Sequence, residues 1–549
     1  IPGVDFTGYS FTGNYERKGR ASEMPAHIEY FNADGRQEFS KNIGFRIRGE
    51  WIRSTGQKAL TIYARSEYDV NNEFKYELFP GLTKPGTHTI QTKYKRFILR
   101  NAGNEWGYQV NSMCRDMLTQ SLFDRLDVKY QAGNSCVVFL NGEYWGIQNI
   151  RELNDKRGLE FSYGVEPDSI IMMEDNLNGP FQLVEGNDAD VLQYHAMRDF
   201  ILQNDLSIPQ NYEQASDMID VENFTDYWIA TIYSNKKNTD HNTSYWKYRN
   251  GQPGQGIRDV FDGRWRWMAN DFDNGFNDAS YNNLTWMIYV MSDSLLKRMI
   301  TSPVFYQTFL SRFADLLNSS FSTSHVLKRI DYFQQILEPE MPEHIARWRT
   351  PSDMANWEVA MNNFRTFAED RPAYQIDQIK SWFGIPNAFK LGVDLNDQIM
   401  GSIQVNSLRI NPALPGVNSS VYPWSGTYFE NIPVSITAYP YSGYRFVKWL
   451  ETGEATATIT VNLQGDMTRT AVFELDPTQL LSKNEFYPNP VVGNEIHLIT
   501  RSIVSIFDMA GKEVIHSDLP VVSINVSSLQ KGVYMVRLNG GEGIRFVKL

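Results

Sequence analysis

The sequence predicts an α+β protein in which one large mixed domain is followed by two small all-β domains. With 549 residues the chain is too long for a single hydrophobic core, and about three domains are expected. Helix-like and strand-like periodicities both occur before Pro386, whereas only short alternating segments with Gly, Pro and Asn turns follow it. We therefore expect domains at 1–387, 388–475 and 476–549.

Composition narrows the class of protein. Apolar residues make up 42% and aromatic residues 13% of the chain, which is enough core material for globular domains. The net charge of −12 argues against nucleic acid or an anionic membrane as a partner. No apolar run approaches the roughly 20 residues that a membrane span requires. Cys114 and Cys136 are too few for a disulfide scaffold, and we expect two buried free thiols in a monomer.

The first 151 residues are expected to form strands and one helix. Alternating segments predict strands at His27–Phe31, Ile43–Glu50, Lys58–Arg65 and Tyr94–Arg100. Apolar residues on one helical face predict a helix at Trp106–Leu126. Asn141-Gly142 lies between two further alternating segments, Ser135–Leu140 and Tyr144–Ile150, which is typical of a two-residue hairpin.

Lys58 begins a strand that follows the polar loop GEWIRSTGQ. A strand, a flexible loop and a second strand can fold over a triphosphate, with loop amides and the Lys58 ammonium on the phosphates. Alternatively, Lys58 is a solvated side chain without a role in binding. Arg100 ends the next strand, where it could contact a phosphate or pair with Asp116 or Glu105.

Glu152 follows the Asn141-Gly142 hairpin and precedes a polar helix near Asp155–Phe161. The order of strands, a Lys-bearing strand, helix, hairpin, link and helices matches the small lobe of a protein kinase, its hinge and the start of its large lobe. Glu152 would then lie at the hinge, beside the nucleotide base or ribose. A salt bridge to Arg151 or Lys156 is the alternative.

The stretch from Thr231 to Asn277 is the candidate catalytic centre. Helical periodicity over Phe224–Ser234 is followed by a polar loop that carries Asp240 and Asn242. Two alternating segments, Ser244–Arg249 and Arg264–Ala269, predict a strand pair.

The second of these strands ends in Asp271-Phe272-Asp273. One loop with an Asp and an Asn is therefore tied by a hairpin to a loop with two carboxylates. Hard oxygen ligands on adjacent loops suit Mg²⁺ with a polyphosphate, although Asp and Asn are also common in plain turns. A kinase catalytic centre has the same order of elements: a helix, a loop with an Asp and an Asn, a hairpin, and a second loop with an Asp.

From residue 294 onward the large domain is predicted to be helical. The expected helices are Leu295–Ile300, Phe305–Leu317, Ser324–Leu337, Glu343–Trp348, Met354–Asp370 and Pro372–Phe383. The small domains that follow contain short alternating segments such as ATITVNL and EIHLIT, which predict strands.

Residues 12–277 resemble the spore-coat protein H (CotH) kinase-like family in its secreted Bacteroidetes-type form. The resemblance lies in GNYERKG, IGFRIRGE, QKALTIYAR, FILRNAGNEW, VVFLNGEYWGIQNIRE, NTDHNTSYWKY and WRWMANDFDNGFN, in that order. It implies a divergent two-lobed protein-kinase fold, with a small lobe at about 1–151 and a large lobe at about 152–387. It also implies ATP as substrate and Mg²⁺ or Mn²⁺ as cofactor.

The same resemblance implies roles for individual residues. Asp240 matches the family's catalytic-loop Asp, and Asp271 and Asp273 match its metal-binding DxD. Lys58 falls on the family's strand Lys and Asn242 on its loop Asn.

The final module resembles the C-terminal sorting domain of the type IX secretion system, on FYPNPVVGNEIHL, SIFDMAGKEV and VSSLQKGVYMVRL. This implies a β-sandwich, interaction with the secretion machinery and a location at the cell surface, associated with the outer membrane. The chain begins IPGVDF without Met, so we expect a signal peptide to have been removed. Residues 389–475 resemble an InlB-type repeat, which implies a small β-grasp-like spacer or adhesion module.

Two functions follow as hypotheses. The first is a secreted or surface protein kinase that uses ATP and a divalent metal, with an unknown protein substrate. The second is a catalytically inactive kinase-like binding or display protein, favoured by the short HNTS loop after Asp240 and by the scarcity of extracellular ATP. A carbohydrate-active enzyme, with Asp240 and Asp271 as its two carboxylates, also fits the aromatic content and the surface setting. The metal-type DxD and the lobe order favour phosphoryl transfer over it.

Overall fold

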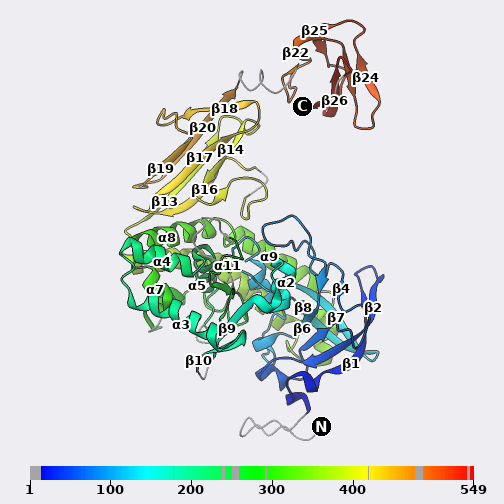
Figure 1. The fold of residues 1–549 in the computed structure, drawn as a ribbon, viewed down its shortest axis with the longest axis vertical. Coiled ribbons are helices and arrows are strands. Elements are labelled where there is room, and N and C mark those ends of the chain that lie inside the picture. The colour runs from blue at the N-terminus through cyan, green and yellow to red at the C-terminus, as the bar shows by residue number, and fades with distance from the viewer. Residues whose placement is uncertain are drawn as a thin grey trace. The chain divides into compact units, whose positions relative to one another are not determined.

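The computed structural model describes residues 14–176, 179–237, 242–249, 251, 259–290, 294–417, 420–476, 486–540 and 544–549. It divides into two units, Ile1–Ala388 and Phe389–Leu549. The first unit mixes helices and sheets, and the described part of the second contains strands alone (Figure 1).

The N-terminal part of the first unit is built on a six-stranded antiparallel sheet in the order β1-β2-β3-β6-β8-β7. Its strands are β1 (Met24–Phe31), β2 (Gln37–Ile47), β3 (Leu60–Tyr63), β6 (Arg96–Arg100), β7 (Gly133–Leu140) and β8 (Glu143–Arg151). One face packs apolar side chains into a core, among them Leu60, Ile62, Phe97, Leu99 and Ile150. A small pair, β4 (Phe74–Lys75) and β5 (Lys93–Tyr94), adds Phe74 and Tyr94 to that core.

The predicted hairpin is confirmed. Leu140 pairs with Glu143, and Asn141 and Gly142 both have positive φ angles, 51° and 80°. Two consecutive left-handed residues make the type I′ turn, whose twist matches that of the strands it joins.

The helix predicted over Trp106–Leu126 is wrong in length, because α1 covers only Arg115–Ser121. The buried carboxylate of Glu105 accepts the backbone N–H of Ser112 at 3.2 Å and its hydroxyl at 2.7 Å. Met113 then adopts a left-handed φ of 65°, which a continuous helix excludes. Hydrogen bonds of the Glu105 side chain thus hold the first half of the predicted helix in irregular conformation.

The remainder of the first unit holds a four-stranded antiparallel sheet in the order β10-β9-β11-β12 and most of the helices. These strands are β9 (Ile170–Asn176), β10 (Gly179–Glu185), β11 (Ser244–Tyr248) and β12 (Arg266–Met268). The predicted pairing of the last two is confirmed, with Ser244 opposite Met268. The helices before β11 are α2 (Lys156–Tyr163), α3 (Asp188–Gln203), α4 (Pro209–Met218) and α5 (Val221–Tyr233).

Helix α5 leads into the candidate catalytic loop. Asp220 caps it by accepting the N–H of Asn223 at 3.1 Å, and every side chain from Asn223 to Tyr233 is buried. The helix predicted over Phe224–Ser234 is therefore confirmed. Because α5 is packed on all sides, it is a fixed support for the loop that leaves its C-terminus.

The later helices are α6 (Asn283–Thr285), α7 (Leu295–Met299), α8 (Pro303–Leu317), α9 (Thr323–Leu337), α10 (Met341–Trp348) and α11 (Met354–Phe383). The prediction of separate helices on either side of Pro372 is wrong, because α11 runs through that residue. A proline has no N–H for the carbonyl four residues earlier. That carbonyl, of Ala368, accepts the hydroxyl of Thr323 at 3.0 Å instead.

Short single turns complete the first unit: η1 (Asn14–Glu16), η2 (Arg20–Ser22), η3 (Trp51–Arg53), η4 (Gly103–Glu105), η5 (Pro167–Ser169) and the π-helical η6 (Trp286–Val290).

In the second unit, residues 388–476 form two four-stranded sheets, β16-β13-β20-β18 and β15-β14-β17-β19. The strands are β13 (Ala388–Leu395), β14 (Gly401–Val405), β15 (Leu408–Arg409), β16 (Trp424–Phe429), β17 (Val434–Pro440), β18 (Tyr444–Trp449), β19 (Thr458–Val461) and β20 (Met467–Leu475). A β-grasp sheet packs against a helix, and the described residues of this module contain none. The β-grasp-like expectation is therefore wrong on this point, because all its segments alternate with a period of two.

Residues 486–540 and 544–549 form a three-stranded sheet, β21-β22-β25, and a four-stranded sheet, β24-β23-β26-β27. The strands are β21 (Phe486–Tyr487), β22 (Glu495–Ser502), β23 (Val504–Phe507), β24 (Glu513–His516), β25 (Val521–Asn525), β26 (Gly532–Leu538) and β27 (Ile544–Lys548). Both sheets contribute to one core that includes Ile496, Val504, Val536 and Phe546.

Both cysteines are free thiols, as expected, with Cys114 buried and Cys136 partly buried. Across the described ranges, the helices are all too short or too polar to cross a bilayer.

Candidate functional site

Two loops of the first unit meet at the side chains of Asn242 and Asp271. The first loop leaves α5 and enters β11, and the second follows β12. The Asn242 amide Nδ2 donates to Asp271 Oδ2 at 2.9 Å. Both residues have left-handed backbones, with φ angles of 62° and 54°, which Asn and Asp adopt more readily than other non-glycine residues. Asp240 lies outside the described residues.

Lys236 connects the same two loops through their backbones. Its ammonium Nζ donates to the carbonyl of Asn242 at 3.0 Å and to the carbonyl of Asn270 at 2.8 Å. The side chain is completely buried, and burial lowers the pKa of Lys236 to about 8. A buried amine that holds one carbonyl from each loop fixes the distance between them.

Arg100, at the end of β6, reaches both carboxylates of the second loop. Its Nη2 lies 2.7 Å from Asp271 Oδ1 and 2.7 Å from Asp273 Oδ2. Burial alone would lower the pKa of Arg100, but the neighbouring carboxylates raise it above its ordinary value. The alternative pairings from the sequence are weak or absent: Asp116 is 3.9 Å away, and Glu105 pairs with Arg115 instead.

Asp273 is buried under the turn that follows β6. Its Oδ2 accepts the backbone N–H of Asn104 at 2.9 Å, and its Oδ1 accepts the Asn104 side-chain amide at 2.8 Å. Gly103, with a φ of 64°, allows this approach, because a Cβ there would lie 2.2 Å from Asp273 Oδ2. Burial and the adjacent Asp271 carboxylate raise the pKa of Asp273 to about 7.

A second ion pair lies beneath these groups. Asp116, on α1, pairs with Arg151, at the end of β8, and accepts the backbone N–H of Phe272 at 2.7 Å. Although burial raises the pKa of Asp116, Arg151 and Arg100 lower it well below its usual range. This carboxylate therefore stays charged and holds the Asp271–Asp273 loop through Phe272.

The donors in this cluster suit a divalent cation by type. Carboxylate and amide oxygens from Asp271, Asp273 and Asn242 are the hard ligands that Mg²⁺ and Mn²⁺ prefer. Burial is the main cause of the raised pKa of Asp273, and the neighbouring Asp271 carboxylate adds to it. Within the part of the chain that the structure describes, no group of three or more His, Cys, Asp or Glu side chains is placed to hold a metal.

Lys58 lies just before β3, in the loop that follows β2. Its Nζ donates to the carbonyls of Arg53 at 2.6 Å and Thr55 at 2.5 Å, and it stacks on the Tyr15 ring at 4.3 Å. Asn101 ties this loop to the end of β6, because its amide donates to the Gln57 carbonyl at 2.8 Å. Lys58 is therefore close in the fold to Arg100 but bonded to its own loop.

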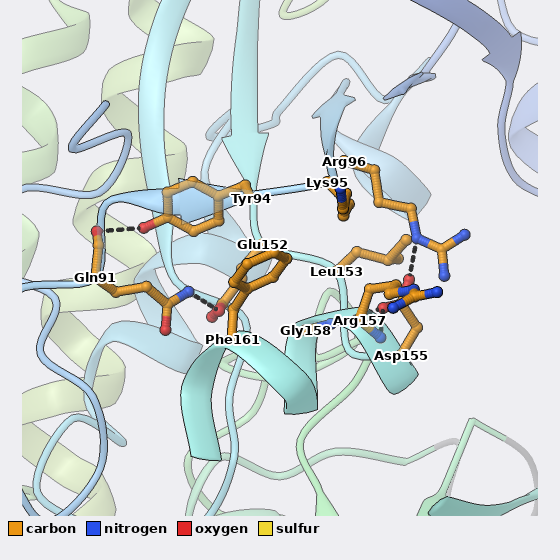
Figure 2. Close-up of a pocket in the computed structure, with 10 residues that line it drawn as sticks. All are labelled: Gln91, Tyr94, Lys95, Arg96, Glu152, Leu153, Asp155, Arg157, Gly158 and Phe161. Atoms are coloured by element: carbon orange, nitrogen blue, oxygen red, sulfur yellow. Dashed lines mark hydrogen bonds and ion pairs between the residues drawn. The ribbon is translucent and has the colours of Figure 1, made fainter. Parts of the chain in front are cut away.

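Glu152 follows β8 and lines a small pocket with Gln91, Tyr94, Lys95, Arg96, Leu153, Asp155, Arg157, Gly158 and Phe161. Figure 2 shows its carboxylate turned toward Gln91, whose amide donates to it at 2.9 Å, while Arg96 and Asp155 pair at the other end. The second carboxylate oxygen of Glu152 pairs with the Lys129 ammonium at 2.6 Å. Neither sequence alternative is its partner, since Arg151 binds Asp116 and Lys156 binds Glu185.

Several residues of the cluster had no signal in the sequence. Lys236 belongs to no motif, Asn104 lies in the segment FILRNAGNEW without a predicted role, and Asp116 is predicted only as a possible partner of Arg100. The contacts of Asn104 with Asp273 and of Asp116 with Phe272 each join residues more than 150 positions apart. Lys236 lies only four residues before Asp240, but the sequence would be the same if it were an ordinary exposed lysine in a polar loop. Only the tertiary structure shows that these three residues belong to the cluster.

Comparison with known proteins gives family matches and little else. No curated protein matches the chain. Among solved structures, a DUF3823 family protein from Parabacteroides merdae ATCC 43184 matches at 14% identity over 29% of this chain and 96% of that one. Its TM-score of 0.11 is too low to support an argument about fold.

Three family models match in order along the sequence. A divergent InlB B-repeat domain matches residues 409–477, and a secretion system C-terminal sorting domain matches residues 485–549. The sorting domain marks the chain as a secreted or surface protein. The CotH kinase protein model matches residues 45–375, which is more than half of the chain. The protein therefore belongs to the CotH kinase family.

Proposed function

We propose that this protein is a secreted or cell-surface atypical protein kinase that transfers the γ-phosphoryl group of ATP to protein hydroxyls. The observation that carries the proposal is the contact between Asn242 and Asp271, 2.9 Å from amide to carboxylate. Phosphoryl transfer needs positioning and charge neutralisation more than covalent help, so converging polar loops are its main requirement.

In this proposal Asp271, Asp273 and Asn242 hold Mg²⁺ or Mn²⁺. When bound, the ion neutralises charge on the phosphate oxygens. Asp116 and Lys236 hold the two loops in place through Phe272, Asn242 and Asn270.

Asp240 is the proposed catalytic residue. It lies two positions before Asn242 in the sequence, and Asn242 contacts Asp271. It would accept the hydrogen bond of the acceptor hydroxyl and take its proton as the bond to phosphorus forms.

Lys58, Arg100 and Glu152 are the proposed nucleotide-binding residues. Arg100 supports this best, since its guanidinium lies at the acidic pair. Lys58 would act on the phosphates through the loop that Asn101 holds, and Glu152 would border the base or ribose at the pocket of Figure 2.

The proposal also assigns the parts of the chain. Residues 1–151 are the small lobe and 152–387 the large lobe of a divergent kinase-like domain, supported by the strand-rich first part and the helix-rich second part. The module at 388–475 is a spacer, and the β-sandwich at 476–549 engages the type IX secretion machinery.

The direct test is phosphate incorporation from γ-labelled ATP into candidate proteins or into the chain itself. Asp240→Ala and Asp271→Ala should each abolish incorporation with Mg²⁺ or Mn²⁺, while circular dichroism shows an unchanged fold. Incorporation by Asp240→Ala equal to that of the parent would end the assignment of Asp240.

A catalytically inactive binding or display protein is the second candidate. It is favoured by one observation: Arg100 and Asn104 already satisfy the Asp273 carboxylate within the protein. Saturating nucleotide at about 100 times its Kd stabilises a protein by roughly 2.7 kcal/mol. An unchanged melting temperature at millimolar ATP with Mg²⁺ and with Mn²⁺ would favour this second function.

A further inference from the structure

One face of the six-stranded sheet carries a set of arginines. Register pairs Arg46 with Thr61, Thr61 with Ile98, and Ile98 with Arg151, so these side chains share a face. Because side chains alternate along a strand, Arg96 and Arg100 join Ile98 on that face, and Arg48 joins Arg46. The opposite face is the apolar core.

Four of these five arginines are bound to acceptors within the protein. Arg46 donates to the Tyr63 hydroxyl and lies 3.7 Å from Glu23, and Arg96 pairs with Asp155 at 2.5 Å. Of the other two, Arg100 pairs with Asp271 and Asp273, and Arg151 pairs with Asp116.

Arg48 differs from the other four. It is partly buried, yet its guanidinium makes no ion pair and no side-chain hydrogen bond with any residue that the structure describes. Burial and the like charge of Arg100 lower the pKa of Arg48 below its ordinary value. The guanidinium is only half-buried, so its donors are accessible to the oxygens of a ligand.

Arg48 stands in line with Arg100 across the sheet. The backbone N–H of Arg48 donates to the Ala59 carbonyl at 2.8 Å. Leu60 pairs with Leu99, so one step along the antiparallel register Ala59 lies beside Arg100. The two arginines are two strands apart, so their Cα atoms lie about 10 Å from each other. Only the methyl group of Ala59 lies between them.

The backbone after Arg48 is fixed. Gly49 has a φ of 100°, and a Cβ there would lie 2.2 Å from Ile52 Cγ1. The Arg53 guanidinium donates to the Gly49 carbonyl at 2.5 Å and to the Tyr15 carbonyl at 2.8 Å. Arg48 therefore extends from a fixed strand end, so the backbone needs no ordering when this side chain binds a ligand.

We propose that Arg48 binds the polyphosphate chain of the nucleotide, through oxygens of the phosphates next to those at the Arg100–Asp271–Asp273 cluster. This rests on the proposed kinase function and adds a residue to it. A guanidinium presents a planar set of donors that matches phosphate oxygens, and such charge-assisted bonds are worth about 1.5–3 kcal/mol. Loss of Arg48 should thus weaken triphosphate binding about 10- to 100-fold.

The test is calorimetric titration of the full chain with ATP, AMP and inorganic tripolyphosphate, with Mg²⁺ present. Arg48→Gln should weaken binding of ATP and tripolyphosphate at least tenfold and leave AMP binding within twofold of the parent. Arg48→Lys, which keeps the charge but not the fork of donors, should fall between the two. Arg36→Gln is the matched control, since Arg36 lies in the exposed β1–β2 turn and pairs only with Glu38 among described residues.

The outcomes separate the inference from the function it rests on. If the parent binds ATP and folded Arg48→Gln binds it equally well, the role of Arg48 is wrong and the kinase proposal stands. If the parent binds tripolyphosphate but not ATP, and Arg48→Gln loses that binding, the polyphosphate site stands without the kinase. If the parent binds none of the three ligands, both fall. Matched melting temperatures of the variants and parent exclude misfolding as the cause.

Discussion

The amide of Asn242 donates to the carboxylate of Asp271 at 2.9 Å, although 29 positions separate the two residues. The bond joins the loop after α5 to the loop after β12, and Lys236 reinforces it through the carbonyls of Asn242 and Asn270. The two loops therefore form one polar unit on a buried scaffold, which is the arrangement that metal-dependent phosphoryl transfer requires.

Asn242→Asp should make the fold depend on a divalent cation. The substitution replaces a donor by a carboxylate opposite Asp271, and like charges in contact repel. We expect a melting temperature several degrees below that of the parent in chelator, which recovers on addition of Mg²⁺ or Mn²⁺. Asn274→Asp, which adds the same charge to the loop that carries Asp271, is the control. Equal melting temperatures of Asn242→Asp with and without metal would contradict the metal site.

Gly103→Ala should displace Asp273. The added Cβ would lie 2.2 Å from Asp273 Oδ2, in addition to the strain of a left-handed alanine. Gly107→Ala separates these effects, since Gly107 has a φ of 90° and nothing within 4 Å of its Cβ position. We expect both variants to lose about 1 kcal/mol of stability from strain, and only Gly103→Ala to lose metal-dependent ATP binding. Retention of that binding by Gly103→Ala would show that Asp273 is not a ligand.

Arg371→Met should loosen the end of α5. The buried Arg371 guanidinium, on α11, donates to four backbone carbonyls, those of Ile232, Tyr233, Ala279 and Tyr281. The carbonyls of Ile232 and Tyr281 keep the backbone N–H groups of Asn235 and Asn283 as partners, so those of Tyr233 and Ala279 lose their hydrogen-bond partner. Each buried carbonyl left unpaired costs about 1–3 kcal/mol, so the total loss should be about 2–6 kcal/mol.

Hydrogen exchange provides the measurement for Arg371→Met. The amides of Ser234 and Asn235, which bond back to α5, should exchange much faster than in the parent. Arg365→Gln removes a guanidinium from the exposed side of the same helix, where it pairs with Asp331, and should cost under about 1 kcal/mol. Unchanged exchange in Arg371→Met would mean that the helix holds α5 by packing alone.

Stability should fall in mild acid because of His344. Burial lowers the pKa of His344 to about 4, below its ordinary value of 6.5, and its Nδ1 accepts the backbone N–H of Ile147 at 3.0 Å. A folded-state pKa below the unfolded one stabilises the fold above pH 6.5, and this contribution is lost as the pH falls toward 4. Its full size is about 3 kcal/mol.

The check is a set of urea denaturation curves between pH 7 and pH 4. His344→Gln should be less stable than the parent at pH 7 and lose less stability on acidification. His325, whose pKa burial also lowers to about 4, should account for part of the remaining slope. A slope in His344→Gln as steep as in the parent would assign the acid sensitivity to other groups.

Local chemistry made some elements predictable. Asn141-Gly142 specifies its hairpin because two left-handed residues are needed there, and these residues tolerate that conformation. The helix over Val221–Tyr233 and the pairing of Ser244 with Met268 follow from periodicity and a turn-rich link. Asp271, Asp273 and Asn242 were candidates for the same reason: they stand in loops directly after a strand or helix.

Elements in which a side chain takes a backbone hydrogen-bonding group were predicted wrongly. The helix over Trp106–Leu126 loses its first half because Glu105 binds Ser112. The break expected at Pro372 is absent because Thr323 takes the carbonyl that proline frees. Glu105 and Ser112 are only seven positions apart, but periodicity does not show that their side-chain bond replaces the helix. Thr323 and Ala368 are 45 positions apart.

By itself, the sequence determined the Asn141-Gly142 hairpin, the helix α5, the pairing of β11 with β12 and which loops carry carboxylates, because those properties depend on neighbours a few positions away. The tertiary structure alone decided that Arg100 bridges Asp271 and Asp273, that Lys236 joins two loops, and that Arg48 has no acceptor among the described residues. These charges come from segments as many as 173 positions apart, and burial fixes both their distances and the strength of their interactions.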